Sequence, residues 1–108
     1  MTDPTSPRER AEAFEALADA RRSVRRFSDV PVPEEVMRSA FRSAHLAPSS
    51  NNLQPWEFHW VRSGSPQRAK AVAACLSQPA AATSADLVFL IGRPDLLSDR
   101  AAAMVAHF

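Results

Sequence analysis

Apolar residues recur along the chain at helical spacing, which predicts several amphipathic helices. The pattern covers residues 8–20, 33–46 and 94–108. Ser65 and Pro66 suit the cap and the first position of a further helix. The second and third helices are expected to turn their apolar faces inward, whereas no later element covers the last one. The four faces comprise Ala11, Phe14, Leu17 and Ala18; Val36, Met37, Ala40, Phe41 and Ala44; Ala69, Val72, Ala73 and Leu76; and Leu97, Ala101, Met104 and Phe108.

Two short strands are predicted between the helices. Residues 57–62 place Phe58 and Trp60 on one face of the first strand. Residues 87–91 are apolar without interruption, which favours a central strand with neighbours on both sides. Pro33 is expected at the first position of its helix, since a proline there loses no hydrogen bond.

Length and composition indicate one small globular domain. The chain has 108 residues, of which 45% are hydrophobic and 23% are charged. A domain of this size buries roughly two-thirds of the surface that its unfolded chain exposes, so its core is modest. Residues 1–7, rich in Pro, Ser and Thr, are expected to be disordered.

Charge and cysteine content narrow the functional class. The formal net charge of +1 gives no electrostatic reason to expect nucleic-acid or membrane partners. Cys75 is the only cysteine, so no internal disulfide is possible. Residues 1–10 lack the apolar stretch of a signal peptide, and the apolar run at 87–92 is too short for a membrane span. Cytoplasmic localisation is therefore expected.

The segment Arg21-Arg22-Ser23-Val24-Arg25-Arg26-Phe27 has the chemistry of a phosphate site. Guanidinium and hydroxyl groups are strong donors to a phosphate dianion. Residues two apart share a face in an extended segment, so Arg21, Ser23 and Arg25 can point together. The alternative is a solvated basic turn whose arginines interact with the negative end of the preceding helix.

The segment from Ala47 to Trp56 has the chemistry of a site for a flat heterocycle. It reads Ala-Pro-Ser-Ser-Asn-Asn-Leu-Gln-Pro-Trp, and its prolines restrict the backbone of the loop between them. Hydroxyl and amide side chains can both donate and accept hydrogen bonds. The alternative is an ordinary Ser/Asn turn that caps the next element.

Taken in this order, the two segments resemble the first half of the FMN-dependent nitroreductase family. The family pattern is an R-R-S-x-R-x-F turn, a helix, and a P-S-S-x-N-x-Q-P-W loop that leads into a strand. The resemblance covers residues 17–92. It implies an α+β fold with a mainly antiparallel sheet flanked by helices. It also implies that residues 1–108 are the N-terminal half of an FMN-binding domain and that the chain is truncated.

The resemblance also implies an activity and a site. Members pass electrons from NAD(P)H through FMN to a nitroaromatic, a quinone or a similar small acceptor, and they work as homodimers with FMN at the interface. By resemblance, Arg21, Arg22 and Ser23 hold the phosphate and ribityl chain, and Arg25 lies near flavin N1 and O2. The loop residues that match the family are Ser49, Ser50, Asn52 and Gln54.

No other catalytic pattern is visible in the sequence. The histidines lack metal-ligand spacing, and His45 is expected to be a packed, hydrogen-bonded side chain. The serines lack a G-x-S-x-G elbow, and two glycines cannot form a G-x-G-x-x-G fingerprint. We therefore assign no catalytic side chain and no metal ligand. A half-enzyme that needs a second chain, or a non-catalytic remnant that acts as an interaction module, remains the alternative.

Overall fold

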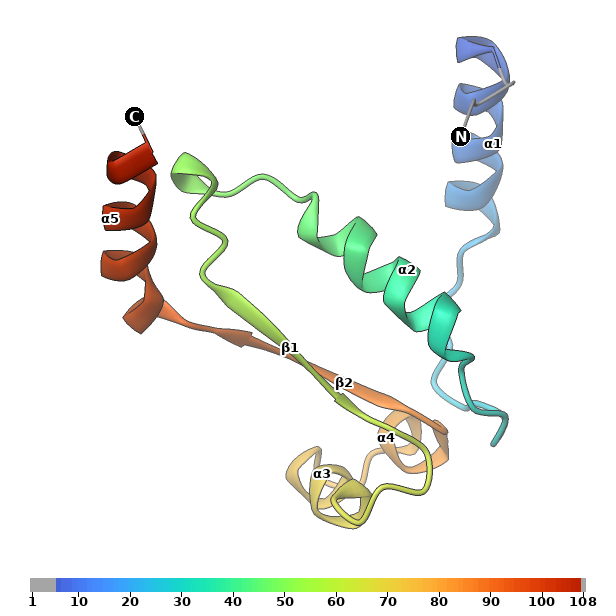
Figure 1. The fold of residues 1–108 in the computed structure, drawn as a ribbon. Coiled ribbons are helices and arrows are strands. Elements are labelled where there is room, and N and C mark those ends of the chain that lie inside the picture. The colour runs from blue at the N-terminus through green and yellow to red at the C-terminus, as the bar shows by residue number, and fades with distance from the viewer. Residues whose placement is uncertain (1–5, 108) are drawn as a thin grey trace.

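The computed structural model describes residues 6–107, which form helices around one antiparallel strand pair (Figure 1). The elements, in chain order, are α1 (Pro7–Ala20), α2 (Glu34–His45), the 3-10 turn η1 (Ser50–Asn52), β1 (Trp56–Val61), α3 (Arg68–Ala74), α4 (Pro79–Thr83), β2 (Leu87–Gly92), the 3-10 turn η2 (Pro94–Leu96) and α5 (Leu97–His107). This arrangement confirms the predicted α+β class and antiparallel pairing.

The start of α1 corrects the predicted disorder at its last two positions. The Oγ of Ser6 accepts from the Glu9 backbone N–H at 3.2 Å, and the Ser6 N–H donates to the Glu9 carboxylate at 2.6 Å. This reciprocal capping box, with Pro7 as the first helical residue, fixes the helix start. Residues 1–5 lie outside the described residues.

Three other predicted helix starts are also displaced. The helix predicted from residue 94 begins at Leu97, after the 3-10 turn η2. Pro33 is the N-cap of α2 rather than its first residue, with an extended backbone at φ −56° and ψ 143°. After Ser65 and Pro66 a turn intervenes before α3, because the Ser65 carbonyl accepts from the Arg68 N–H at 3.1 Å and its hydroxyl accepts from the Gln67 N–H. The short helix α4 was not predicted.

The strand pair is not the wide sheet that the apolar segment 87–91 suggested. Within residues 6–107 the sheet contains β1 and β2 alone, with Phe58 opposite Leu90 and Trp60 opposite Val88. The prediction that β2 is a central strand is therefore wrong for this part of the chain. Val88 and Leu90 lie on the same face of the pair as Trp60 and Phe58, and they are 42% and 66% exposed.

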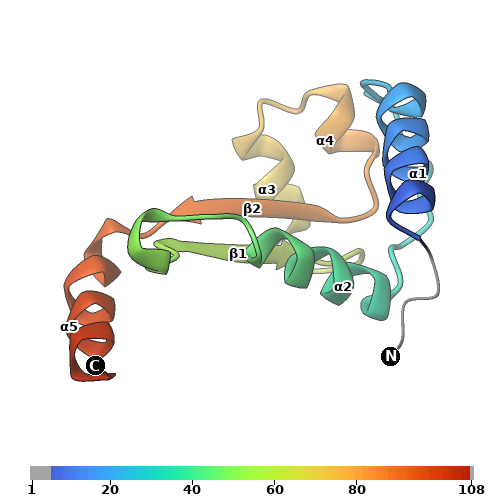
Figure 2. The same ribbon diagram turned by 90° about the horizontal axis from the view of Figure 1, so that it is seen from above.

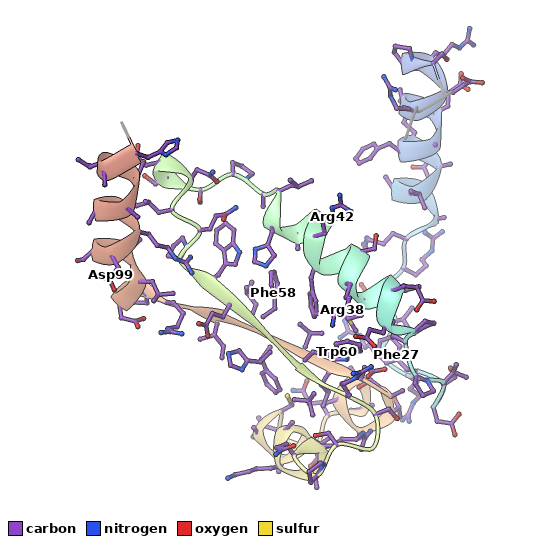
Figure 3. The ribbon with its side chains drawn as sticks, viewed as in Figure 1. Phe27, Arg38, Arg42, Phe58, Trp60 and Asp99 are labelled. Carbon is purple, nitrogen blue, oxygen red and sulfur yellow. The ribbon has the colours of Figure 1, made fainter. Side chains whose placement is uncertain are left out.

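α2 lies beside β1 (Figure 2), and an aromatic cluster that includes Phe58 and Trp60 packs the two together (Figure 3). The Phe41 ring from α2 stacks on Phe58 with centroids 5.2 Å apart, and its edge contact with Trp60 is 6.2 Å. Phe58 and Trp60 thus share a face, as their alternation predicted. Arg62 lies over the Trp60 ring, 4.3 Å from its centroid, which is a cation–π contact.

The molecule is open, and its core is small. The radius of gyration is 17.9 Å, whereas a compact chain of this length has about 13 Å. Among the described residues, only Met37, Ala81 and Ala85 are buried apolar side chains. The apolar face of α1 has no cover: Phe14 and Leu17 are both 72% exposed. The faces predicted to point inward on the second and third helices are only partly buried, since Met37 is buried but Val36 and Leu76 are 53% and 82% exposed.

One further property of the helices bears on function. Among residues 6–107, no helix combines the length and the apolar character needed to cross a membrane.

Candidate functional site

The arginine segment, residues 21–27, follows α1 as extended and exposed backbone. Arg21 ends the helix, with φ −60°, ψ 136° and a backbone N–H that donates to the Leu17 carbonyl at 3.0 Å. Arg22 donates through Nη1 to the Asp19 carbonyl at 2.6 Å and to the Arg21 carbonyl at 2.8 Å. Arg22 thus also makes the helix-end contact that was the alternative role of these cations. Ser23 and Arg25 are exposed.

Thr83, the last residue of α4, and Asp86, in the turn before β2, anchor the end of the arginine segment and the backbone that follows it. The Phe27 N–H donates to the Thr83 Oγ1 at 2.9 Å, and the Val32 N–H donates to the Asp86 Oδ2 at 2.7 Å. The partners are more than fifty residues apart in sequence. These contacts fix the direction in which the extended segment leaves α1.

Asp86 joins three parts of the chain. Besides Val32, its carboxylate accepts from the Trp60 indole N–H and from the Ser63 backbone N–H, both at 3.0 Å. Burial raises the pKa of Asp86, but these donors and the nearby Arg62 cation lower it by more. The pKa therefore lies below its ordinary value of 3.8.

The polar loop, residues 48–55, is a compact turn that its own side chains close. The Ser49 hydroxyl accepts from the Gln54 N–H at 3.0 Å, and the Ser49 carbonyl accepts from the Asn52 N–H at 2.9 Å. Asn51, Asn52 and Gln54 have positive φ angles of 52°, 53° and 48°. Asparagine tolerates this left-handed conformation well, whereas glutamine does not. Ser50 and Asn52 are exposed, so their polar groups are accessible to a ligand.

His45, at the end of α2, connects the helix to this loop. Its carbonyl accepts from the Gln54 side-chain amide at 2.9 Å, and its Nδ1 accepts from the Trp56 indole N–H at 3.1 Å. The His45 ring also meets the edge of Phe58 at 4.9 Å. The predicted hydrogen bonding of His45 is confirmed, but the residue is exposed and packs only through its ring contacts with Trp56 and Phe58.

Arg100 on α5 is the residue of this region that was not predicted. Its Nη1 donates to the Leu53 carbonyl at 3.1 Å and also to the Gln54 carbonyl. A cation four residues into a helix faces the positive end of the helix dipole, which is unfavourable. This unfavourable position in the helix is a signal in the sequence that could have pointed to Arg100, but it does not identify the carbonyl groups that Arg100 contacts.

Cavities flank the polar loop on both sides. One, of about 480 Å³, lies between the loop and α5 on the side of Arg100, and the other, of about 620 Å³, on the side of Leu97. Both volumes are in the range of small-molecule sites. The first is lined by His45, Asn51, Asn52, Leu53, Gln54, Trp56, Arg100, Ala103 and Met104; the second is lined by Pro48, Ser49, Ser50, Leu53, Pro55, Trp56, Leu97, Ser98 and Ala101.

The arginine segment and the polar loop lie at opposite ends of α2 (Figures 1 and 2). The helix has 12 residues, and at 1.5 Å per residue it separates them by about 18 Å. Within the described residues of one chain, the candidate site residues therefore fall into two groups, one with Arg21, Arg22, Ser23 and Arg25 and one with Ser49, Ser50, Asn52 and Gln54.

The sequence profile of the Nitroreductase family matches residues 18–104, which include both groups. The chain belongs to this family. The chain is 48% identical over 61 residues to nitroreductase NfnB of Mycolicibacterium smegmatis (strain ATCC 700084 / mc(2)155), covering 56% of this chain and 26% of that protein. It is 45% identical over 58 residues to a 4-nitrobenzoate reductase of Nocardioides sp. (strain LMS-CY), covering 54% of this chain and 23% of the relative.

A solved structure shares the fold. A nitroreductase-like protein from Streptococcus mutans superimposes with a TM-score of 0.66 at 24% identity, covering 91% of this chain and 58% of that one. This similarity confirms the predicted nitroreductase-like fold. The matched segments span about a quarter of the length of the two curated relatives.

Proposed function

We propose that this chain is the FMN-binding half of a cytoplasmic oxidoreductase of nitroreductase type. Electrons pass from NAD(P)H through FMN to a nitroaromatic, a quinone or a similar small acceptor. The proposal is carried by one observation. This chain belongs to the family and contains both an exposed arginine segment and a polar loop that is flanked by cavities. The names of the relatives, among them a 4-nitrobenzoate reductase, support a nitroaromatic acceptor.

The exposed donors suit the two ends of FMN. Arg21, Arg22 and Ser23 hold the phosphate and the ribityl chain, and Arg25 lies at the N1/O2 edge of the ring. Arg22 can still give its remaining N–H groups to a phosphate while Nη1 binds the end of α1. The flavin, when bound, supplies the hydride and electron transfer, and the protein binds and orients it.

The polar loop supplies the second set of contacts. Ser50 and Asn52 present their side chains to the ring, while Ser49 and Gln54 keep the loop closed and retain one hydrogen-bonding group each for the ligand. Because α2 separates the loop from the arginine segment, we propose that the site forms between two copies of the chain. The loop of one copy then meets the cofactor held by the arginine segment of the other.

The competing proposal is a non-catalytic remnant or half-enzyme that acts as an interaction module. The open shape and the exposed apolar faces favour it. Flavin absorbance of the purified chain separates the two functions, because an interaction module has no need of a flavin.

Flavin released from the purified chain by heat is expected to be FMN, because the arginine segment suits one terminal phosphate. Chromatography of the supernatant identifies it. Arg21→Ala should lower the flavin content several-fold, whereas Arg42→Ala, on the side of α2 away from β1 (Figure 3), should leave it unchanged. Recovery of FAD in stoichiometric amount would contradict the proposal.

Arg25→Ala is expected to lower the midpoint potential of the bound flavin, because a cation near N1 and O2 stabilises the anionic reduced form. A charge-assisted hydrogen bond contributes about 1.5–3 kcal/mol, which for a two-electron couple corresponds to about 30–65 mV. The neighbouring Arg26→Ala is the matched control, because successive residues of an extended segment face opposite ways. An unchanged potential with weaker FMN binding would make Arg25 a phosphate ligand instead.

A further inference from the structure

We propose that Arg100 is a positioning residue that holds the polar loop, residues 48–55, in its ligand-binding conformation. The loop presents Ser50 and Asn52 only if its backbone stays in the turn described above. The inference rests on the proposed function, which identifies FMN as the ligand of this loop.

The loop backbone needs support from outside the loop. Gln54 has a φ of 48° and precedes Pro55. The left-handed conformation is unfavourable for a residue with a Cβ atom, and a following proline further disfavours compact backbone. Ser49 holds the Gln54 N–H, and the His45 carbonyl at the end of α2 holds the Gln54 side chain. The Gln54 carbonyl accepts from the Trp56 N–H at 2.8 Å and keeps a second lone pair for another donor, and the contacts within the loop provide no donor for the Leu53 carbonyl.

Arg100 supplies a donor to both of these carbonyls. The Leu53 carbonyl belongs to the peptide plane before the Gln54 Cα, and the Gln54 carbonyl belongs to the plane after it. One guanidinium therefore holds both peptide planes in place. The rotation of these two planes about the Gln54 Cα sets the backbone conformation of Gln54. A rigid, multi-donor guanidinium suits this task better than a lysine ammonium.

The position of Arg100 in α5 supports a specific role. Arg100 is half-buried and lies in the first turn of the helix, where the dipole disfavours a cation. Its carbonyl partners on the loop, 47 and 46 residues earlier in the chain, offset that cost. Arg100 also lines the cavity of about 480 Å³ together with Asn52 and Gln54, so it acts at the wall of the candidate site.

The test measures the loop and the ligand separately in the full chain. Amide hydrogen exchange at Gln54 and at Trp56, whose N–H donates to the Gln54 carbonyl, reports the loop. Exchange at residues 58–61 and 87–90 of the β1–β2 pairing reports the rest of the fold. Titration with FMN, followed by quenching of its fluorescence, reports affinity. The variants are Arg100→Ala and Arg100→Lys, with Arg42→Ala as a control for the loss of an exposed cation.

Arg100→Ala should raise loop exchange at least ten-fold relative to the strand amides and weaken FMN binding about ten-fold. Arg100→Lys should recover part of both, and Arg42→Ala neither. Unchanged loop exchange in Arg100→Ala overturns the inference, as does faster exchange with unchanged FMN affinity. If the wild-type chain binds no FMN, the proposed function fails, and loop exchange alone then decides whether Arg100 holds the loop.

Discussion

The purified chain of residues 1–108 is expected to be oligomeric or poorly folded rather than a well-behaved monomer. Its accessible surface is 8757 Å², whereas a folded monomer of this mass exposes about 5,900 Å². The difference of about 2,800 Å² exceeds what one partner of most obligate dimers buries. Much of the excess is apolar, including Leu17 on α1, Leu90 on β2 and Val105 on α5, each more than 60% exposed. Exposed apolar surface of this kind drives association.

Sedimentation at several concentrations, together with binding of a hydrophobic dye, measures this behaviour. Association should increase with concentration, and dye binding should fall as the apolar faces become covered. If the site forms between two copies, added FMN should shift the chain toward the dimer, because ligand binding stabilises the assembled form. A concentration-independent monomer that melts cooperatively and binds no dye would show that these residues form a complete domain.

Replacement of Asp86 by alanine is expected to destabilise the fold by about 2–3 kcal/mol at neutral pH. One hydrogen bond to a charged group contributes about 1.5–3 kcal/mol, and the expected total for the three bonds stays near that value because Asp86 is partly exposed to solvent. The variant leaves the Val32 and Ser63 N–H groups and the Trp60 indole without their acceptor. Residues 28–33, which connect the arginine segment to α2, then lose their hydrogen bond to the residue that precedes β2. Urea unfolding measures the loss of stability. Asp29→Ala is the matched control, because Asp29 is an exposed aspartate within residues 28–33.

The stabilising effect of Asp86 should depend on pH with a defined sign. The folded-state pKa lies below the ordinary value of 3.8, so the folded form binds its proton less readily than the unfolded chain. The stabilisation is therefore complete above the ordinary pKa and is lost as pH falls through the lowered folded-state pKa. Asp86→Asn should differ from the wild type at pH 7 and approach it in acid. A difference that is constant down to pH 2 would mean that the carboxylate charge is not what stabilises this junction.

Local signals located most elements of the chain. Helical spacing predicted α1, α2 and α5, and alternation placed Phe58 and Trp60 on one face of β1. These signals work because capping, proline restriction and side-chain periodicity act between residues that are near in sequence. The same locality explains where the sequence failed to predict a helix correctly. α4 has only five residues and therefore shows no full apolar period. Ser65 favours a turn as well as a helix cap, so the sequence did not show that α3 starts only at Arg68.

The sequence by itself also determined the family and the residue types that it offers to a ligand, because the two motifs are continuous segments. Only the tertiary structure decided how these segments relate. It separated the arginine segment from the polar loop by the length of α2, and it brought Arg100 and Asp86 to backbone groups 46 to 54 residues away. Such contacts are set by how elements pack, and no periodicity encodes the partner of one arginine or one aspartate. Burial is decided in the same way: α1 has an amphipathic pattern, but its apolar face stays exposed because no described element packs against it.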